Sequence, residues 1–297
     1  MSPDVELQEL AVQEGLDLDL LRRLVRHPGA RRCVARRRDL PVELIEEIIS
    51  LGAARTIAAN PSMPAGVKER LAGHPQPDVR AALAANASDD PPGLLVRLSE
   101  DADSMVRAFL AMNERLDPQI RAGLAADPEP RVRVMVIEHW RDAPEEVRRA
   151  WLTAPEPEVR RAAVHAYPPP PDLLPGLLAD PVTRAAAVRR AEPSADMVTD
   201  SDVEVRLALA AHPALPAGMR DRLAEDSDIF VRNAIAARAD TPAALRDDLV
   251  TTLETDDPRL EWFLTFARQP HACPPPAPAP AARSREQAEE LLARAGL

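Results

Sequence analysis

Short apolar stripes at helical spacing alternate with acidic, proline-containing turns along most of the chain. Residues 91–101, PPGLLVRLSED, show the pattern, because Leu94, Leu95 and Leu98 mark one apolar face of a helix. A proline at the first helical position loses no hydrogen bond, so Pro92 predicts where this helix opens. The acidic residues that follow predict where it ends.

Residues 105–113, MVRAFLAMN, predict a second helix directly after that turn. Asp103 or Ser104 can cap its first turn. Asparagine tolerates the left-handed conformation that ends many helices, so Asn113 predicts the stop. Two helices of about two turns each are not stable alone, because nucleating a helix is unfavourable. The pair therefore needs neighbours.

The helix pair recurs along the chain, and this internal repeat predicts the fold. Helix-opening prolines lie mostly 23–28 residues apart between Pro41 and Pro242, with a weaker unit around residues 193–198. Stacked pairs bury a continuous core. The sequence therefore predicts an all-α fold, an α-solenoid of about ten two-helix repeats of 22–28 residues.

A Val-Arg pair opens most second helices, and we assign it to the repeat framework rather than to a binding code. In residues 77–86 the framework residues are Val79, Arg80, Leu83 and Asn86. The same positions in other units are Val106, Arg107, Val132, Arg133, Val159, Arg160, Val205, Arg206, Val231 and Arg232.

The unit P-x-x-L-x-x-L, a short acidic turn and V-R-x-x-L-A-x-N-P resembles the variant leucine-rich repeat family, an α-solenoid related in shape to HEAT and armadillo repeats. The resemblance covers residues 20–270 and is clearest in residues 200–242. It implies a right-handed superhelix whose repeats pair an α-helix with a short, often 3₁₀, helix. Some members carry an N-terminal iron–sulfur cluster held by clustered cysteines. This chain has only Cys33 there, so we expect no cluster and no cofactor.

An acidic residue stands six positions before the arginine in several units. A carboxylate near a helix N-terminus is favoured by the helix dipole, and arginine can hold it in a bidentate pair. The arginine could also meet the turn of the adjacent repeat. We predict a row of Arg–Asp contacts along one edge of the solenoid, in preference to an arginine row that reads phosphates. The acidic residues are Asp101, Asp127, Asp200 and Asp226.

Charge and motif content narrow the function. The net charge of −11 disfavours a dedicated binder of nucleic acid or anionic membranes. The N-terminus lacks a signal-peptide apolar stretch and no run is long enough to span a membrane, so we expect a cytoplasmic protein. HExxH, phosphate-loop and GxSxG motifs are absent, and Cys33 and Cys273 lack metal-ligand spacing. We expect no catalytic and no metal site.

Residues 22–38 form the one locally basic segment, with eight arginines. Such a segment could bind nucleic acid, a nucleotide or an acidic protein. The alternative is the solvated outer face of a capping repeat. The candidate partner-binding residues of this segment are Arg32, Arg36, Arg37 and Arg38.

A second candidate cluster lies near the middle of the array. His139, Trp140 and Trp151 gather there, and tryptophan is frequent at interface hot spots. Packing within the repeat is the alternative, because His139 occupies the stop position of its helix.

The sequence divides the chain into four segments. Residues 1–24 form an N-terminal capping helix region and 25–272 the solenoid. Residues 273–283 form a Pro/Ala linker. Residues 284–297 form an amphipathic helix whose Leu291 and Leu292 could dock in cis or on a partner.

Together these features predict a non-enzymatic repeat scaffold that binds an unidentified protein or peptide. The alternative is a HEAT-like solenoid that binds nucleic acid, possibly as a DNA glycosylase-type repair protein. The basic segment at residues 22–38 keeps that alternative open.

Overall fold

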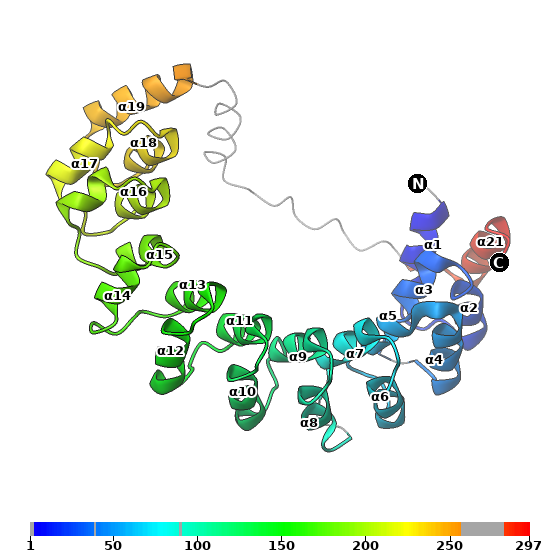
Figure 1. The fold of residues 1–297 in the computed structure, drawn as a ribbon. Coiled ribbons are helices and arrows are strands. Elements are labelled where there is room, and N and C mark those ends of the chain that lie inside the picture. The colour runs from blue at the N-terminus through cyan, green and yellow to red at the C-terminus, as the bar shows by residue number, and fades with distance from the viewer. Residues whose placement is uncertain (1–2, 39, 89–90, 257–281) are drawn as a thin grey trace. The chain divides into compact units, whose positions relative to one another are not determined.

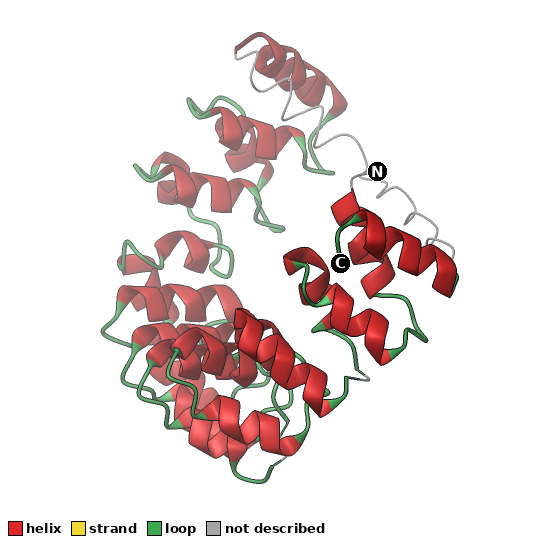
Figure 2. Ribbon diagram, turned by 90° about the vertical axis from the view of Figure 1, so that its right-hand side faces the viewer, coloured by secondary structure: helices red, strands yellow, loops and turns green. Residues whose placement is uncertain are grey.

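The computed structural model describes residues 3–38, 40–88, 91–256 and 282–297. These residues form helices joined by short loops, and they contain no strand (Figure 2). They fall into two compact units. The first ends at Trp140 and includes the C-terminal residues 282–297, and the second begins at Arg141.

The first unit is a stack of helix pairs (Figure 1). A single helix, α1 (Pro3–Ala11), precedes them. The first helices of the pairs are α2 (Leu18–Leu24), α4 (Val42–Ile48), α6 (Ala65–Ala72), α8 (Leu94–Ser99) and α10 (Pro118–Ala125). The second helices are α3 (Pro28–Val34), α5 (Ala54–Ala58), α7 (Pro77–Ala84), α9 (Ser104–Ala111) and α11 (Pro130–His139), with a π-turn, η1 (Ile49–Ala53), joining α4 to α5.

The second unit repeats the arrangement. Its first helices are α12 (Glu145–Leu152), α14 (Leu174–Ala179), the 3₁₀ helix η2 (Ala195–Thr199) and α17 (Ala217–Leu223), followed by α19 (Ala243–Asp256). Its second helices are α13 (Pro157–Ala166), α15 (Arg184–Val188), α16 (Val203–Ala210) and α18 (Ile229–Ala236). The all-helical repeat fold predicted from the sequence is therefore confirmed, while its right-handed twist stays a prediction.

Successive second helices contact one another, so the core runs along each unit from repeat to repeat. In α7, Val79 and Leu83 are each 1% exposed and fill the space between the two helix layers. Ala81 and Ala84 are also buried, and their small side chains let α5, α7 and α9 approach closely. No repeat buries these residues by itself, which is why the pairs are stable only as a stack.

Pro118 opens α10 as predicted, but several other prolines play a different part. Helix α8 begins at Leu94 and not at Pro92, because Gly93 takes a left-handed φ of 82° and turns the chain into the helix. Pro64 likewise precedes its helix as the N-cap residue, with an extended ψ of 147°. Prolines do open second helices, as Pro77 and Pro130 show. The pairing of an α-helix with a 3₁₀ helix that the resemblance implies occurs in one described repeat, η2 with α16, while the other described repeats pair two α-helices.

The C-terminal helix α21 (Arg285–Arg294) docks on α1 and α2 of the first unit (Figure 1). Its predicted capping box between Ser284 and Gln287 is present. Leu291 and Leu292 are 2% and 0% exposed in this contact. Of the two predicted alternatives, docking in cis is the one that the structure shows, because α1 and α2 cover both leucines.

Charged groups surround the apolar contact of α21. Arg283 lies 3.3 Å from a carboxylate oxygen of Glu9 and donates to the backbone oxygen of Glu6. Arg285 lies 2.9 Å from Asp17, and Arg23 donates to the backbone oxygen of Leu297 at 2.7 Å. The predicted boundary at residue 272 and most of the linker 273–283 lie outside the described residues.

Because α21 closes the surface of α1 and α2, Leu292→Ala is expected to weaken the first unit by about 2–4 kcal/mol, the cost of truncating a buried leucine. Hydrogen exchange should then rise in α1, α2 and α21 and stay unchanged in α16 and α18. Glu290→Ala, at an exposed position of the same helix, is the control. Unchanged protection of α1 and α2 in Leu292→Ala would contradict the docking.

Candidate binding surface

Within each unit, a row of arginines ties several repeats to the next one. In α7, Arg80 donates through Nη1 to the backbone oxygen of His74, in the turn before its own helix, at 2.7 Å. Its Nε and Nη2 donate to the two carboxylate oxygens of Asp101, in the following repeat, at 2.7 and 2.9 Å. Arg107 repeats both contacts with the backbone oxygen of Asp101 and the carboxylate of Asp127.

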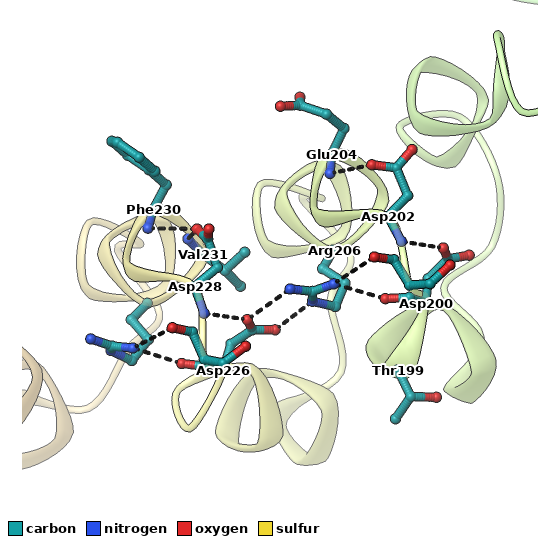
Figure 3. A network of polar contacts seen from close by, with 12 residues as sticks. Thr199, Asp200, Asp202, Glu204, Arg206, Asp226, Asp228, Phe230 and Val231 are labelled. Carbon is teal, nitrogen blue, oxygen red and sulfur yellow. Dashed lines mark hydrogen bonds and ion pairs between the residues drawn. The ribbon is translucent and has the colours of Figure 1, made fainter.

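The second unit contains the same arrangement (Figure 3). Arg206 donates to the backbone oxygen of Asp200 at 2.8 Å and to the carboxylate of Asp226 at 2.7 and 3.1 Å. The Asp226 carboxylate also accepts a hydrogen bond from the backbone nitrogen of Asp228 at 2.8 Å. Each of these aspartates thus joins its own turn to the arginine of the preceding repeat.

The predicted Arg–Asp row exists, but the aspartate six residues before each arginine contributes differently from the prediction. It supplies its backbone oxygen, as Asp101 does to Arg107. The carboxylate comes instead from the aspartate about 20 residues later in the sequence. The reason is that the Asp101 carboxylate is already held by the backbone nitrogen of Asp103 and by Arg80.

The row adapts where the repeat is irregular. Arg184 reaches Asp200, only 16 residues later, because the short 3₁₀ helix η2 replaces a first α-helix in that repeat. In the first repeats Arg31 contacts the backbone oxygen of Leu51 in place of a carboxylate. In α5 the equivalent position is Ala54, so Arg55 lies one residue outside the row.

The contacts of the row lower the pKa of two of its aspartates, Asp101 and Asp226. Burial raises the pKa of Asp101, but the hydrogen bonds from Arg80 and from the Asp103 backbone outweigh it, and the pKa falls below its usual range. The same balance lowers the pKa of Asp226, through Arg206 and Asp228. The carboxylates therefore stay ionised and paired at neutral pH.

A second row of hydrogen bonds joins the ends of the second helices, and sequence reasoning missed it. Asn113 donates to the backbone oxygens of Ala84 and Ala87, in the preceding repeat, at 3.1 and 2.7 Å. Asn60 does the same with Ala35 and Arg37. These contacts satisfy carbonyl groups at the C-terminal end of the neighbouring helix.

The predicted left-handed stop at Asn113 is therefore wrong. Among the described residues only glycines have a positive φ. Asparagine suits this position because its side-chain amide forms two kinds of hydrogen bond. The amide nitrogen donates to the preceding repeat, and the amide oxygen accepts from the backbone nitrogen of Arg115. The recurrence of Asn or His before the turn was the available sequence signal.

The remaining exposed positions of the second helices form what we call the second-helix face, defined separately in each unit. In the first unit it carries Met112, which is 37% exposed, and the half-buried Ala82, Met105 and Phe109 beside it. In the second unit it carries Phe230, which is 49% exposed. These positions differ between repeats, whereas the two hydrogen-bonding rows recur.

Residues 203–228, which include Arg206 and Asp226, match the model of the leucine rich repeat variant family. This stretch is a variant leucine-rich repeat. A comparison with curated proteins found no match. The Arg–Asp row places other repeats of the chain in the same register, as Arg80, Arg107 and Arg160 show.

The predicted aromatic cluster is mostly buried between these variant repeats. Trp151 is 2% exposed and stacks on Tyr167, with ring centroids 5.9 Å apart. Trp140 is 9% exposed. Both tryptophans are buried, which favours the predicted alternative of packing within the repeats over exposed hot spots. His139 is exposed, and its Nδ1 lies 2.9 Å from the backbone oxygen of Met135.

The basic segment separates into structural and exposed arginines. Arg31 belongs to the first row, and Arg37 donates to the backbone oxygens of Ala11 and Gln13. Arg37 is thus a framework residue and not a free partner contact. Arg32, Arg36 and Arg38 are exposed, and the prediction that they contact a partner stays open.

Two further findings bear on function. In the described part of the chain, no helix combines the length and apolarity that a membrane crossing requires. The same residues contain no group of three or more histidine, cysteine or acidic side chains placed to hold a metal ion.

We call each Arg–Asp pair of the row a rung. Removing the charge of one member of a rung should destabilise the stacked repeats. Asp101→Asn keeps the shape but loses the charge that Arg80 faces, and both side chains are largely buried, at 9% and 15% exposed. We expect a loss of about 2–3 kcal/mol in urea unfolding, between the values for exposed and buried pairs. Glu46→Gln is the control, because its pair with Arg70 is about half exposed, and it should change stability by less than about 1 kcal/mol.

The rungs should also make the free energy of unfolding fall at acid pH. The pKa of Asp101 is lower in the folded protein than in the unfolded chain, so below a pH of about 4 the unfolded chain binds more protons. The stabilisation is therefore complete above that pH and is lost as pH falls through the folded pKa. Urea midpoints measured from pH 6 to pH 2 should fall more steeply for the native chain than for Asp101→Asn. Parallel curves would contradict this assignment.

Proposed function

We propose that the chain is a non-enzymatic scaffold that binds another protein or peptide through the second-helix face. The observation that carries the proposal is the contrast between two sets of positions. Framework positions repeat the same hydrogen bonds from unit to unit, as Arg107 and Arg206 do. Face positions vary in size and polarity, and they leave Met112 37% and Phe230 49% exposed.

Exposed apolar side chains on a rigid helical array suit recognition of a protein surface. The non-enzymatic part of the proposal rests on the sequence, which pairs no nucleophile with a base in any known motif. We also propose a cytoplasmic location, since the two widely separated cysteines do not form the disulfide framework typical of small secreted domains.

Binding of nucleic acid, the alternative function, requires exposed cationic side chains. The Arg–Asp row reduces the number of arginines available for it. Arg80, Arg107 and Arg206 each hold an aspartate, so they do not form a free cationic stripe. The exposed arginines that the basic segment can offer to phosphates are Arg22, Arg26, Arg32, Arg36 and Arg38. A labelled DNA duplex therefore serves as a counter-probe in the test below.

The proposal is tested by affinity capture from the source cell with the full chain and two charge-introducing variants. Met112→Asp with Phe230→Asp alters the second-helix face, whereas Val96→Asp alters an equally exposed position on a first helix. We expect proteins captured by the native chain to be lost with the double variant and kept with Val96→Asp. Equal capture by all three chains, or tight binding of the DNA duplex alone, would contradict the proposal.

A further inference from the structure

A hollow of about 340 Å³ opens on the second-helix face of the first unit, across α5, α7 and α9. Its floor is α7, where Ala81, Ala82 and Ala85 present only methyl groups. The neighbouring helices carry longer side chains, so the alanines of α7 create the depression. The floor is held in place by the rung from Arg80 to Asp101, which fixes α7 against its neighbour before any ligand arrives.

The two walls of the hollow differ in chemistry. Met105 and Phe109 of α9 form an apolar wall. Arg36, which follows α3, and Arg55 of α5 contribute two guanidinium groups to the lining on the side of the earlier repeats. Both arginines are exposed, and neither guanidinium group forms a hydrogen bond or ion pair with another residue that the structure describes.

Asp78 is the carboxylate among the lining residues. It lies in the first turn of α7, where the helix dipole favours a negative charge. Two arginines against one aspartate leave the lining with a net positive charge, in a chain whose net charge is −11. Local charge in this hollow is therefore opposite to that of the protein as a whole.

We propose that this hollow binds an extended peptide segment of another protein that carries a carboxylate close to a large apolar side chain. The inference rests on the proposed function and assigns it a place and a ligand class. Arg36 and Arg55 would hold the carboxylate, because guanidinium groups bind carboxylates in bidentate geometry. Phe109 and Met105 would cover the apolar side chain, since aromatic and thioether groups bury large areas with little ordering.

The size of the hollow supports a short segment and not a folded domain. Its volume lies at the lower end of the range for small-ligand sites, about 300–1,000 Å³. The rest of the segment would lie across the neighbouring helices of the face. Because the rows hold these helices rigidly, little ordering of the protein opposes binding.

A hollow in the second unit provides an internal comparison. It also has an alanine floor, at Ala185 and Ala186, and cations at Arg161 and Arg189. Its opposite side, however, carries Asp202 and Glu204 where the first hollow has methionine and phenylalanine. The acidic groups there would repel the carboxylate, and Pro181 and Val182 offer a smaller apolar area than methionine and phenylalanine do. This hollow should not bind the same peptides.

The test begins with a display library of random 12-residue peptides selected on the full chain. We expect the enriched peptides to combine Asp or Glu with Leu, Met, Phe or Trp within a few positions. A labelled synthetic copy of one enriched peptide is then titrated with the native chain and its variants by fluorescence anisotropy. Binding should weaken as salt is raised, because charge pairs at an exposed site are screened.

Three variants probe the hollow directly. Arg36→Glu with Arg55→Glu should weaken binding by at least about tenfold, the effect of losing hydrogen bonds to a charged group. Ala82→Leu should fill the floor, and Phe109→Ala should remove the apolar wall, each with a loss of about fivefold or more. Arg161→Glu with Arg189→Glu, in the second unit, is the matched control and should bind as tightly as the native chain. Thermal melts establish that each variant is folded.

The outcomes separate this inference from the proposed function. Enriched peptides that are basic, or peptides whose affinity is unchanged by all three variants, would overturn the assignment to this hollow. If such peptides lose affinity with Met112→Asp and Phe230→Asp, the proposed function stands while the inference fails. A library that yields no binding peptide overturns the inference, and with equal capture by all chains it overturns the proposed function as well.

Discussion

The hydrogen-bonded pair between an arginine of one repeat and an aspartate of the next is the interaction on which the rest of the structure depends. A repeat of two short helices has no core of its own and few internal hydrogen bonds. Arg107 joins three elements at once: its own helix, the turn before it through the Asp101 backbone, and the following repeat through Asp127. Spacing and orientation of successive repeats are therefore set by one side chain.

The second row of contacts and the small residues of the core complete this arrangement. Asn113 fixes the far end of the same helix against the preceding repeat. Between the two rows, Ala84 and Ala111 are buried and allow the helices to pack at short range. In a helix such as α9, both ends are held and the inner side is buried, so the outward positions contribute little to stability. They are consequently free to differ between repeats, and that freedom is what a binding surface requires.

Much of this could be predicted from the sequence, because it is encoded locally and then repeated. The helix pairs, the Asp103 cap and the Ser284 capping box follow from short-range rules, and all are present. The partner of each arginine could not be predicted with the same rules. Asp101 and Asp127 are both plausible partners of Arg107 in the sequence, and only packing of adjacent repeats brings the later carboxylate to the guanidinium. Trp151 was misassigned for the same reason, since Tyr167 covers it only in the folded unit. The hollow above α7 forms because the side chains of α7 are shorter than those of the neighbouring helices. A repeat consensus averages such differences, so it does not predict the hollow.

A double-mutant cycle on Arg206 tests the central claim most directly. The free energy of unfolding is measured for Arg206→Gln, Asp226→Asn and the double variant, and in parallel for Arg206→Gln with Asp200→Asn. The inter-repeat contact predicts a coupling energy of about 1–3 kcal/mol between Arg206 and Asp226. It predicts a clearly smaller coupling with the Asp200 side chain, whose backbone oxygen is the atom that Arg206 contacts. A larger coupling with Asp200 than with Asp226 would show that the arginines stabilise single repeats and would contradict the account.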